Sequence, residues 1–262
     1  MSPQPDKKLI PSQHLSWVQL SAWYILWVVA QELSLRERKK QQTRSRLWRT
    51  AIELFGERGF DQVSVAEIAA AAEVSKMTVF NYFATKEDLV LGPMQEHVGD
   101  LARIVRERGP GESVVEALRR QYLDRLAARD PSVGLNDDPT VLRVQRLVQS
   151  TPALLKGAYD FLVRSQDLLA RELATMAAQN RPDAGGGTAV SEFTARAAAA
   201  QIAAVRNTLF VEIIGRLLAG ESADEIYPDT VRLVEQSFDL LEHGLRGFGG
   251  PSDPASAAPA AG

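Results

Sequence analysis

The stretch SVAEIAAAAEVSKMTVFNYFATK, residues 64–86, decides the fold of this chain. Its first half repeats apolar residues at i, i+3, i+4 and i+7, the spacing of one buried helical stripe, and Ser64 is positioned to cap that helix. After a short bend, Ser75 is positioned to cap a second helix that buries Val79 and Phe83. The stretch therefore predicts two short helices joined by a tight turn.

The second of these helices keeps a set of side chains away from the core: Lys76, Met77, Thr78, Asn81 and Tyr82. Upstream, residues 36–49 carry seven basic residues and one acidic residue, although the net charge of the whole chain is −3. Positive charge concentrated beside a helix pair is what binding to the DNA backbone requires. We therefore expect this part of the chain to read a groove of double-stranded DNA.

Roles in such a complex follow from the chemistry of the side chains. The candidates for base edges are Lys76, Met77, Thr78 and Asn81, and the candidates for phosphates are Arg44, Ser64, Ser75, Tyr82 and Lys86. Two alternatives stay open: the two serines act only as helix caps, and Thr78 faces solvent.

The composition of the 262-residue chain favours an all-helical protein, because helix-forming residues dominate its long periodic segments and strand signals are scarce. The chain has no cysteine, which excludes a disulfide framework, a thiolate nucleophile and a cysteine metal site. Its three histidines, His14, His97 and His243, are far apart, without a His-Glu-x-x-His pattern. We expect a cytoplasmic protein that is not an enzyme and has no catalytic residues, metal or cofactor.

Residues 1–33 do not match the rest of the chain. Within them, Leu15–Ala30 is apolar and carries three tryptophans but no charge. This segment is shorter than the ~20 apolar residues of a membrane-spanning helix, and no small-residue cleavage site of a signal peptide follows it. We expect a poorly ordered extension or the result of a start codon assigned too early, and no stable membrane association. An interaction helix and a membrane anchor are the alternatives.

Periodicity and helix-breaking residues predict the other helices. The first amphipathic helix is expected at Gln41–Arg58, before Gly59, and Gly92-Pro93 is expected to kink a helix capped by Thr85. Residues 85–107 are therefore predicted as a bent connector. Further helices are expected at 112–129, 139–149, 151–180, 191–219 and 229–245.

Two segments are predicted to lack helical structure. Residues 182–187 contain three consecutive glycines and are expected to be a flexible break. Residues 249–262 are of low complexity and cannot bury enough apolar surface to become ordered.

Residues 44–86 resemble the DNA-binding domain of TetR-family transcriptional regulators. The matching motifs are Ala51, Leu54-Phe55, Gly59-Phe60, Ser64-Val65, Ile68-Ala69 and Val74-Ser75. The second helix and its exit, usually Tyr-x-His/Tyr-Phe-x-x-Lys, read Phe80-Asn81-Tyr82-Phe83-Ala84-Thr85-Lys86 here. The resemblance implies a three-helix helix-turn-helix DNA-binding domain at 34–91, joined to a larger helical ligand-binding and dimerisation domain at 92–248.

Three positions depart from the family pattern where its members contact DNA. Phe80 replaces the usual tyrosine and loses a hydroxyl-to-phosphate hydrogen bond, and Met77 replaces a frequent glycine. Glu73 stands where the turn usually has glycine, which tolerates a positive φ that glutamate does not. We therefore expect strain or a changed turn at Glu73, and an altered groove-facing surface.

The resemblance also implies a ligand-responsive repressor, which binds a palindromic operator as a homodimer and is released by a small apolar or acyl-type effector. Residues 138–174 resemble, more weakly, a subgroup of the family that binds acyl-coenzyme A or similar hydrophobic ligands. Candidate ligand-binding residues are Tyr122, Arg143, Arg146, Gln149, Tyr159, Asn207 and Phe210. The alternatives are that these residues form ordinary core and surface ion pairs, and that the protein is a helix-turn-helix activator or nucleoid-associated protein without ligand gating.

A dimer surface is expected on the last two helices. The segment 195–218 repeats apolar residues in near-helical register, and it is more apolar than one helix face requires; the repeat comprises Ala198, Ile202, Val205, Leu209, Ile213 and Leu217. In the family, the last two helices pair across a two-fold axis as a four-helix bundle. The alternative is that the repeat closes the core of the monomer.

Overall fold

The computed structural model describes residues 17–180 and 188–244, with side chains described for 35–179 and 192–244. Within these ranges the chain is helical and has no strand, which confirms the all-α class. The chain divides into two compact units, residues 1–49 and 50–262. The first 16 residues of the predicted extension, the predicted break at 182–187 and the predicted tail lie outside the described residues.

The first helix, α1, spans Trp17–Arg58 and is much longer than predicted. Residues 17–33, which were predicted as a poorly ordered extension or the result of a start codon assigned too early, are part of this helix. The reason is that no glycine or proline interrupts the chain between Trp17 and Phe55, so nothing ends the helix earlier. Residues 35–40 of its basic segment are exposed, whereas Leu47 is buried.

The helix pair predicted from residues 64–86 is present as α2, Val65–Ala71, and α3, Lys76–Tyr82. The two helices pack against each other. Their buried residues are Ile68, Ala69 and Val79, and the last residues of α1 contribute Ala51, Ile52 and Phe55, which are fully buried. The rings of Phe55 and Phe60 lie 4.9 Å apart in a tilted arrangement.

The connector consists of two short helices, α4, Asp88–Gln95, and α5, Asp100–Arg106. A kink was expected at Pro93, but α4 continues through this residue and ends at Gln95; the change of direction comes in the turns at 96–99.

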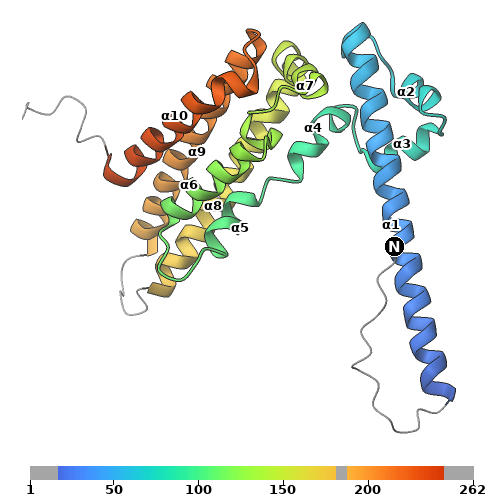
Figure 1. Ribbon diagram of the computed structural model, residues 1–262, viewed down its shortest axis with the longest axis horizontal. Helices are drawn as coiled ribbons and strands as arrows, with labels where there is room; N and C mark the ends of the chain where they lie inside the picture. Colours follow the sequence, from blue (N-terminus) through green and yellow to red (C-terminus); the bar gives the residue numbers. More distant parts are fainter. Residues whose placement is uncertain (1–16, 181–187, 245–262) are drawn as a thin grey trace, which may run out of the picture. The chain divides into compact units, whose positions relative to one another are not determined.

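The rest of the chain forms a helical bundle from α6, Val114–Ala127; a short 3₁₀ helix, η1, Pro131–Val133; α7, Pro139–Ser150; α8, Pro152–Asn180; α9, Thr188–Leu218; and α10, Ala223–His243. In this bundle α8 packs against α5, α7 and α9, and α10 packs against α6 and α9 (Figure 1).

The last helix begins earlier than predicted. It starts at Ala223, because Ser222 and Glu225 form a capping box, and it continues through Pro228, which the prediction took as a boundary.

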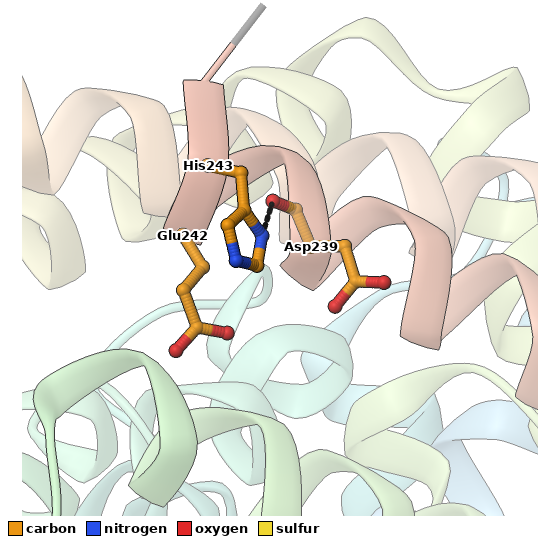
Figure 2. A group of neighbouring side chains, drawn as sticks. All are labelled: Asp239, Glu242 and His243. Carbon is orange, nitrogen blue, oxygen red and sulfur yellow. Dashed lines mark hydrogen bonds between the residues drawn. The ribbon is translucent and has the colours of Figure 1, made fainter. Parts of the chain in front are cut away.

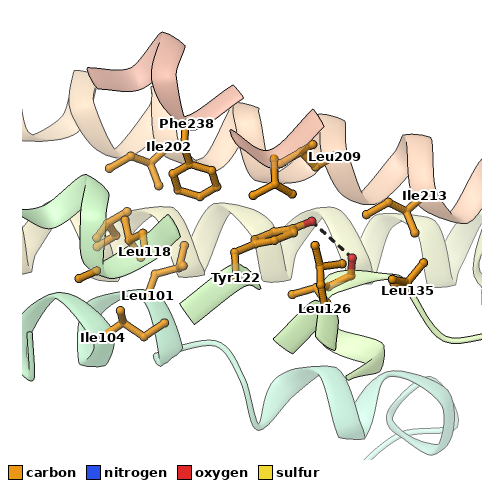
Figure 3. Close-up of a cluster of buried hydrophobic side chains, with 14 of the residues drawn as sticks. Leu101, Ile104, Leu118, Tyr122, Leu126, Leu135, Ile202, Leu209, Ile213 and Phe238 are labelled. Carbon is orange, nitrogen blue, oxygen red and sulfur yellow. Dashed lines mark hydrogen bonds between the residues drawn. The ribbon is translucent and has the colours of Figure 1, made fainter. Parts of the chain in front are cut away.

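The core of the bundle surrounds Tyr122 of α6, whose ring lies 6.0 Å from that of Phe238 of α10 (Figure 3). The α9 repeat that was predicted as a dimer surface faces this core. Ile202, Leu209, Ile213 and Leu217 are at most 4% exposed. The prediction is corrected for these residues, because an apolar repeat in a long helix serves the monomer core when other helices cover it.

One segment, Glu192–Leu218 within α9, is long and apolar enough to cross a membrane by length and composition alone. A core helix of a soluble bundle passes the same test, and α9 packs against both α8 and α10.

Candidate nucleic-acid interface

Ser64 and Glu67 form a reciprocal cap at the start of α2. The Ser64 hydroxyl accepts the Glu67 N–H at 3.2 Å and lies 2.8 Å from Glu67 Oε2, which also accepts the Ser64 N–H at 2.8 Å. The backbone N–H of Ser64 and the guanidinium of Arg58, 2.6 Å from Glu67 Oε1, lower the pKa of Glu67 to about 2. Ser64 therefore caps α2, and its assignment to a phosphate stays a prediction.

The turn between α2 and α3 keeps a left-handed residue. Glu73 has φ +53°, and the turn is held by bonds from Glu73 N–H to Ala70 O at 3.1 Å and from Val74 N–H to Ala69 O at 2.9 Å. The expected strain is therefore present, because a left-handed residue other than glycine costs ~1–2 kcal/mol. The turn thus has the left-handed conformation that glycine adopts without strain, although the residue here is glutamate.

The cap of α3 is formed by Ser75. Its hydroxyl accepts the Thr78 N–H at 3.0 Å and lies 2.8 Å from the hydroxyl of Thr78. Both hydroxyls are thus engaged in the first turn of the helix, and Thr78 is half-buried. Their first role is to define where α3 begins.

An exposed face of α3 consists of two i, i+4 pairs, Lys76 with Phe80 and Met77 with Asn81. Met77 is 70% and Phe80 41% exposed, which is unusual for large apolar side chains. The Lys76 ammonium lies 5.8 Å from the centre of the Phe80 ring. From the sequence, Phe80 was expected only to lack a phosphate contact. Its exposed position on the same face as Met77 places it among the groove-facing candidates.

The remaining phosphate candidates differ in how firmly they are held. The Lys86 ammonium lies 4.4 Å from the centre of the Phe60 ring and 5.6 Å from that of Phe55, so cation–π contacts fix its position. Tyr82 is half-buried at the end of α3. Arg44 is half-buried on α1 within the unit 1–49.

The seven ligand-binding candidates are not gathered into one pocket. Tyr122 is buried in the core, and Phe210 is partly buried on α9. Arg146, Gln149, Tyr159 and Asn207 are exposed. The side chain of Arg143 lies so close to Gly56 that a Cβ there would collide with it. Tyr122 is therefore the candidate that lies inside the bundle.

A cluster of possible metal ligands lies at the end of α10, where Asp239, Glu242 and His243 bring ligand atoms within 4.8 Å of one another (Figure 2). Arg119 of α6 pairs with both carboxylates at 2.8 Å, and His243 Nδ1 lies 3.1 Å from the Asp239 carbonyl oxygen. The arginine neutralises the charge that a cation would need, so this exposed cluster indicates an ion-pair network.

Comparison with known proteins matches residues 47–92 to the family described as bacterial regulatory proteins, tetR family. The chain is 32% identical over 150 residues to an uncharacterized HTH-type transcriptional regulator, MT2310, of Mycobacterium tuberculosis, a match that covers 52% of this chain and 77% of the relative. The chain belongs to the TetR family. It is accordingly a helix-turn-helix transcriptional regulator, with the matched residues containing α2 and α3.

Two other TetR-family matches extend over less of the relative. The HTH-type transcriptional regulator TcmR of Streptomyces glaucescens is 34% identical over 152 residues, 57% of this chain and 65% of TcmR. The HTH-type transcriptional repressor Rv3405c of Mycobacterium tuberculosis is 33% identical over 82 residues, 31% of this chain and 43% of the repressor. The chain thus spans less than two thirds of the length of either protein.

Proposed function

We propose that this TetR-family protein is a ligand-responsive repressor that binds a palindromic operator as a homodimer. A small apolar or acyl-type effector would release it. The observation that carries the DNA-binding part is the exposed face of α3, a helix capped at its N-terminus that presents Lys76, Met77, Phe80 and Asn81 together. A relative that is named a repressor supports repression over activation.

In the proposed complex the N-terminal half of α3 enters the major groove. Lys76 can donate to guanine acceptors and Asn81 can pair with adenine. Met77 and Phe80 suit the methyl groups of thymine, because both are exposed and apolar. Thr78 and Ser75 contribute mainly through the cap that fixes the start of the helix.

Phosphate contacts would set the register of the protein on the duplex. Lys86 is suited to this role because the rings beneath its ammonium hold it in one place while its charge stays available to a phosphate. Tyr82 and Arg44 are the other proposed phosphate ligands.

We place the dimer contact on the outer face of α9. This face has exposed apolar residues, Phe193 at 65% and Val211 at 61%, and exposed small residues, Ala200, Ala204 and Gly215, which would let a partner helix approach closely. Two copies are needed because one helix-turn-helix contacts few base pairs, and paired half-sites supply the specificity.

Release by an effector requires that the bundle and the DNA-reading helices respond to each other. Two close helix contacts support such coupling: Arg143 of α7 lies over Gly56 of α1, and Leu91 of α4 lies over Gly157 of α8. An effector that prefers one packing at these contacts would shift the population of DNA-binding conformers. A coupling free energy of ~1–3 kcal/mol would lower the operator affinity ~5–150-fold.

This function needs no catalytic residue, metal or cofactor and fits a protein of the cytoplasm. The competing function is a helix-turn-helix activator or nucleoid-associated protein without ligand gating. Footprinting on the DNA upstream of its own gene distinguishes the two. The repressor predicts one palindromic protected site that is lost when an organic extract of the source cells is added. Scattered protection that no extract changes would contradict it.

A further inference from the structure

Arg206, in the middle of α9, is partly buried, and its guanidinium has no polar partner. Its Nη1 atom is buried without a hydrogen bond, and among the described residues Arg206 forms neither a hydrogen bond nor an ion pair. Burial lowers the pKa of this guanidinium, but arginine stays protonated in proteins. A buried cation without an anion is strongly unfavourable, so the position needs an explanation.

The neighbour of Arg206 is Tyr122, whose ring centre lies 5.0 Å from the guanidinium carbon. The Tyr122 hydroxyl points at the carbonyl oxygen of Val133 at 3.4 Å, a long and weak hydrogen bond (Figure 3). Burial raises the pKa of Tyr122 to about 12, so the hydroxyl keeps its proton at neutral pH. Two strong donors, one cationic and one neutral, therefore lie side by side in the core.

The nearest acid does not neutralise Arg206. Asp100 of α5 is engaged by Arg125, by Arg103 at 3.1 Å and by His97 at 3.1 Å. Burial opposes its ionisation, but the hydrogen bonds from Arg125, Arg103 and His97 outweigh this and lower the pKa of Asp100 to about 2. Arg125 also places a second positive charge near Arg206. Arg103 also pairs with Glu107 at 3.4 Å and Arg125 with Asp130 at 3.8 Å. The acids of this cluster are thus engaged by the other two arginines, and among the described residues none forms an ion pair with Arg206.

We propose that Arg206 and Tyr122 bind the carboxylate of an acidic apolar effector. This inference rests on the proposed function and names the chemical class of its ligand. The surrounding core is apolar, with Leu126, Ile202 and Leu209 buried, so the body of the ligand is apolar as well. A free acid carries its charge directly on the apolar body. In a coenzyme A thioester the carbonyl is neutral and the negative charges lie on distant phosphates, so we expect the free acid to bind in preference.

The test is calorimetric titration of the full chain with matched probes. These are decanoate against 1-decanol, 2-naphthoate against 2-naphthalenemethanol, and decanoyl-coenzyme A. We expect at least one acid to bind about 10-fold or more tightly than its alcohol and than the thioester, the effect of a charged hydrogen bond in a buried site. Equal affinities within each pair, or no binding by any acid, would overturn the proposal.

Variants separate a binding role from a structural one. Arg206→Met should abolish the preference for acids, and Arg206→Lys should retain part of it. Arg196→Met, at an exposed arginine of the same helix, should leave the preference unchanged. Arg206→Met should also raise the melting midpoint of the ligand-free protein by about 2–4 °C or more, because it removes an unpaired buried charge. A lowered midpoint would show that Arg206 is a structural residue and would overturn the proposal.

Failure of this inference is distinguishable from failure of the proposed function. If an extract releases wild-type protein and Arg206→Met equally from the footprinted site, ligand gating stands and the acid site is wrong. If no extract releases the wild type while decanoate or 2-naphthoate binds through Arg206, the acid site stands and the gating is wrong.

Discussion

Helix α3 and the middle of α9 both hold side chains in unfavourable environments, but of opposite kinds. On α3 the large apolar residues Met77 and Phe80 are exposed to water. In α9 the guanidinium of Arg206 is buried among apolar residues and lacks an anion. Each feature is unfavourable in the isolated protein, and each becomes favourable when a ligand of complementary chemistry covers it.

The difference indicates two kinds of recognition in one chain. A short exposed helix, with one buried residue in its seven, recognises a large partner by presenting a surface. Under the proposed function, a long helix within a covered core would recognise a small molecule by enclosing it. Substitutions that change one region at a time test this contrast.

The largest effect is expected when an aromatic residue of the bundle core and one on the exposed face of α3 are each truncated. Phe238→Ala should lower the free energy of unfolding by about 3–5 kcal/mol, since its ring is fully buried beside Tyr122. Phe80→Ala should change stability by less than about 0.5 kcal/mol and lower the affinity for DNA instead. Urea unfolding and fluorescence anisotropy with operator DNA measure the two quantities. A large stability loss in Phe80→Ala would place that ring in the core.

The second effect concerns base readout. Asn81→Ala should cost about 1–3 kcal/mol of operator binding and relax the sequence preference at one base pair of each half-site. Lys86→Ala is the matched control: it should weaken binding to all DNA sequences alike and reduce the salt slope by about one. Anisotropy titrations at several salt concentrations, with operator and mismatched duplexes, check both. A changed sequence preference in Lys86→Ala would refute its assignment to a phosphate.

The third prediction concerns the charges beside Arg206. The pKa of Asp100 is lowered to about 2 from 3.8, so its ionised form stabilises the protein above about pH 4, and this stability is lost as the pH falls towards 2. Asp100→Asn should therefore be less stable than wild type by about 1–2 kcal/mol at pH 6.5, after allowance for solvent screening.

Urea unfolding from pH 6.5 to 2.5 measures this gap, which should close as the pH falls. Asp167→Asn, at an exposed acid of α8, is the control and should show no such gap. A gap as large at pH 2.5 as at pH 6.5 would mean that the aspartate acts through packing instead of charge.

The smallest effect is expected in the turn before α3. Glu73→Gly should stabilise the protein by about 1 kcal/mol, because glycine adopts the positive φ of this residue without strain. Glu73→Ala removes the same charge but keeps the strain, so it should give no gain. Thermal melts of the two variants separate conformational strain from charge. Equal stabilisation by both would attribute the effect to the carboxylate.

Local patterns predicted the DNA-reading region well. The caps at Ser64 and Ser75, the buried Ile68 and Val79, and the strain at Glu73 all follow from residues within one or two turns of each other. Such features depend on hydrogen bonds and sterics inside a short segment, so the sequence contains them directly.

Contacts between residues far apart in the chain were harder to predict. The apolar repeat of α9 is equally suited to a dimer contact and to a monomer core, and only its neighbours α8 and α10 decide that Ile202 and Leu209 face inwards. The candidates Tyr159 and Asn207 turn out to be exposed for the same reason. Which face of a helix is covered depends on contacts between residues far apart in the chain.

By itself the sequence determined that the chain is helical, where α2 and α3 begin, and which family it belongs to, because caps, periodicity and turn residues act locally. Only the tertiary structure decided that Arg206 is buried beside Tyr122 and lacks an anion. An arginine in a helix is ordinarily solvated, and nothing next to residue 206 in the chain marks it as different. Its significance arises because α5 and α6 bring Asp100 and Arg125 close to α9 and pair them with each other, so that Asp100 does not pair with Arg206.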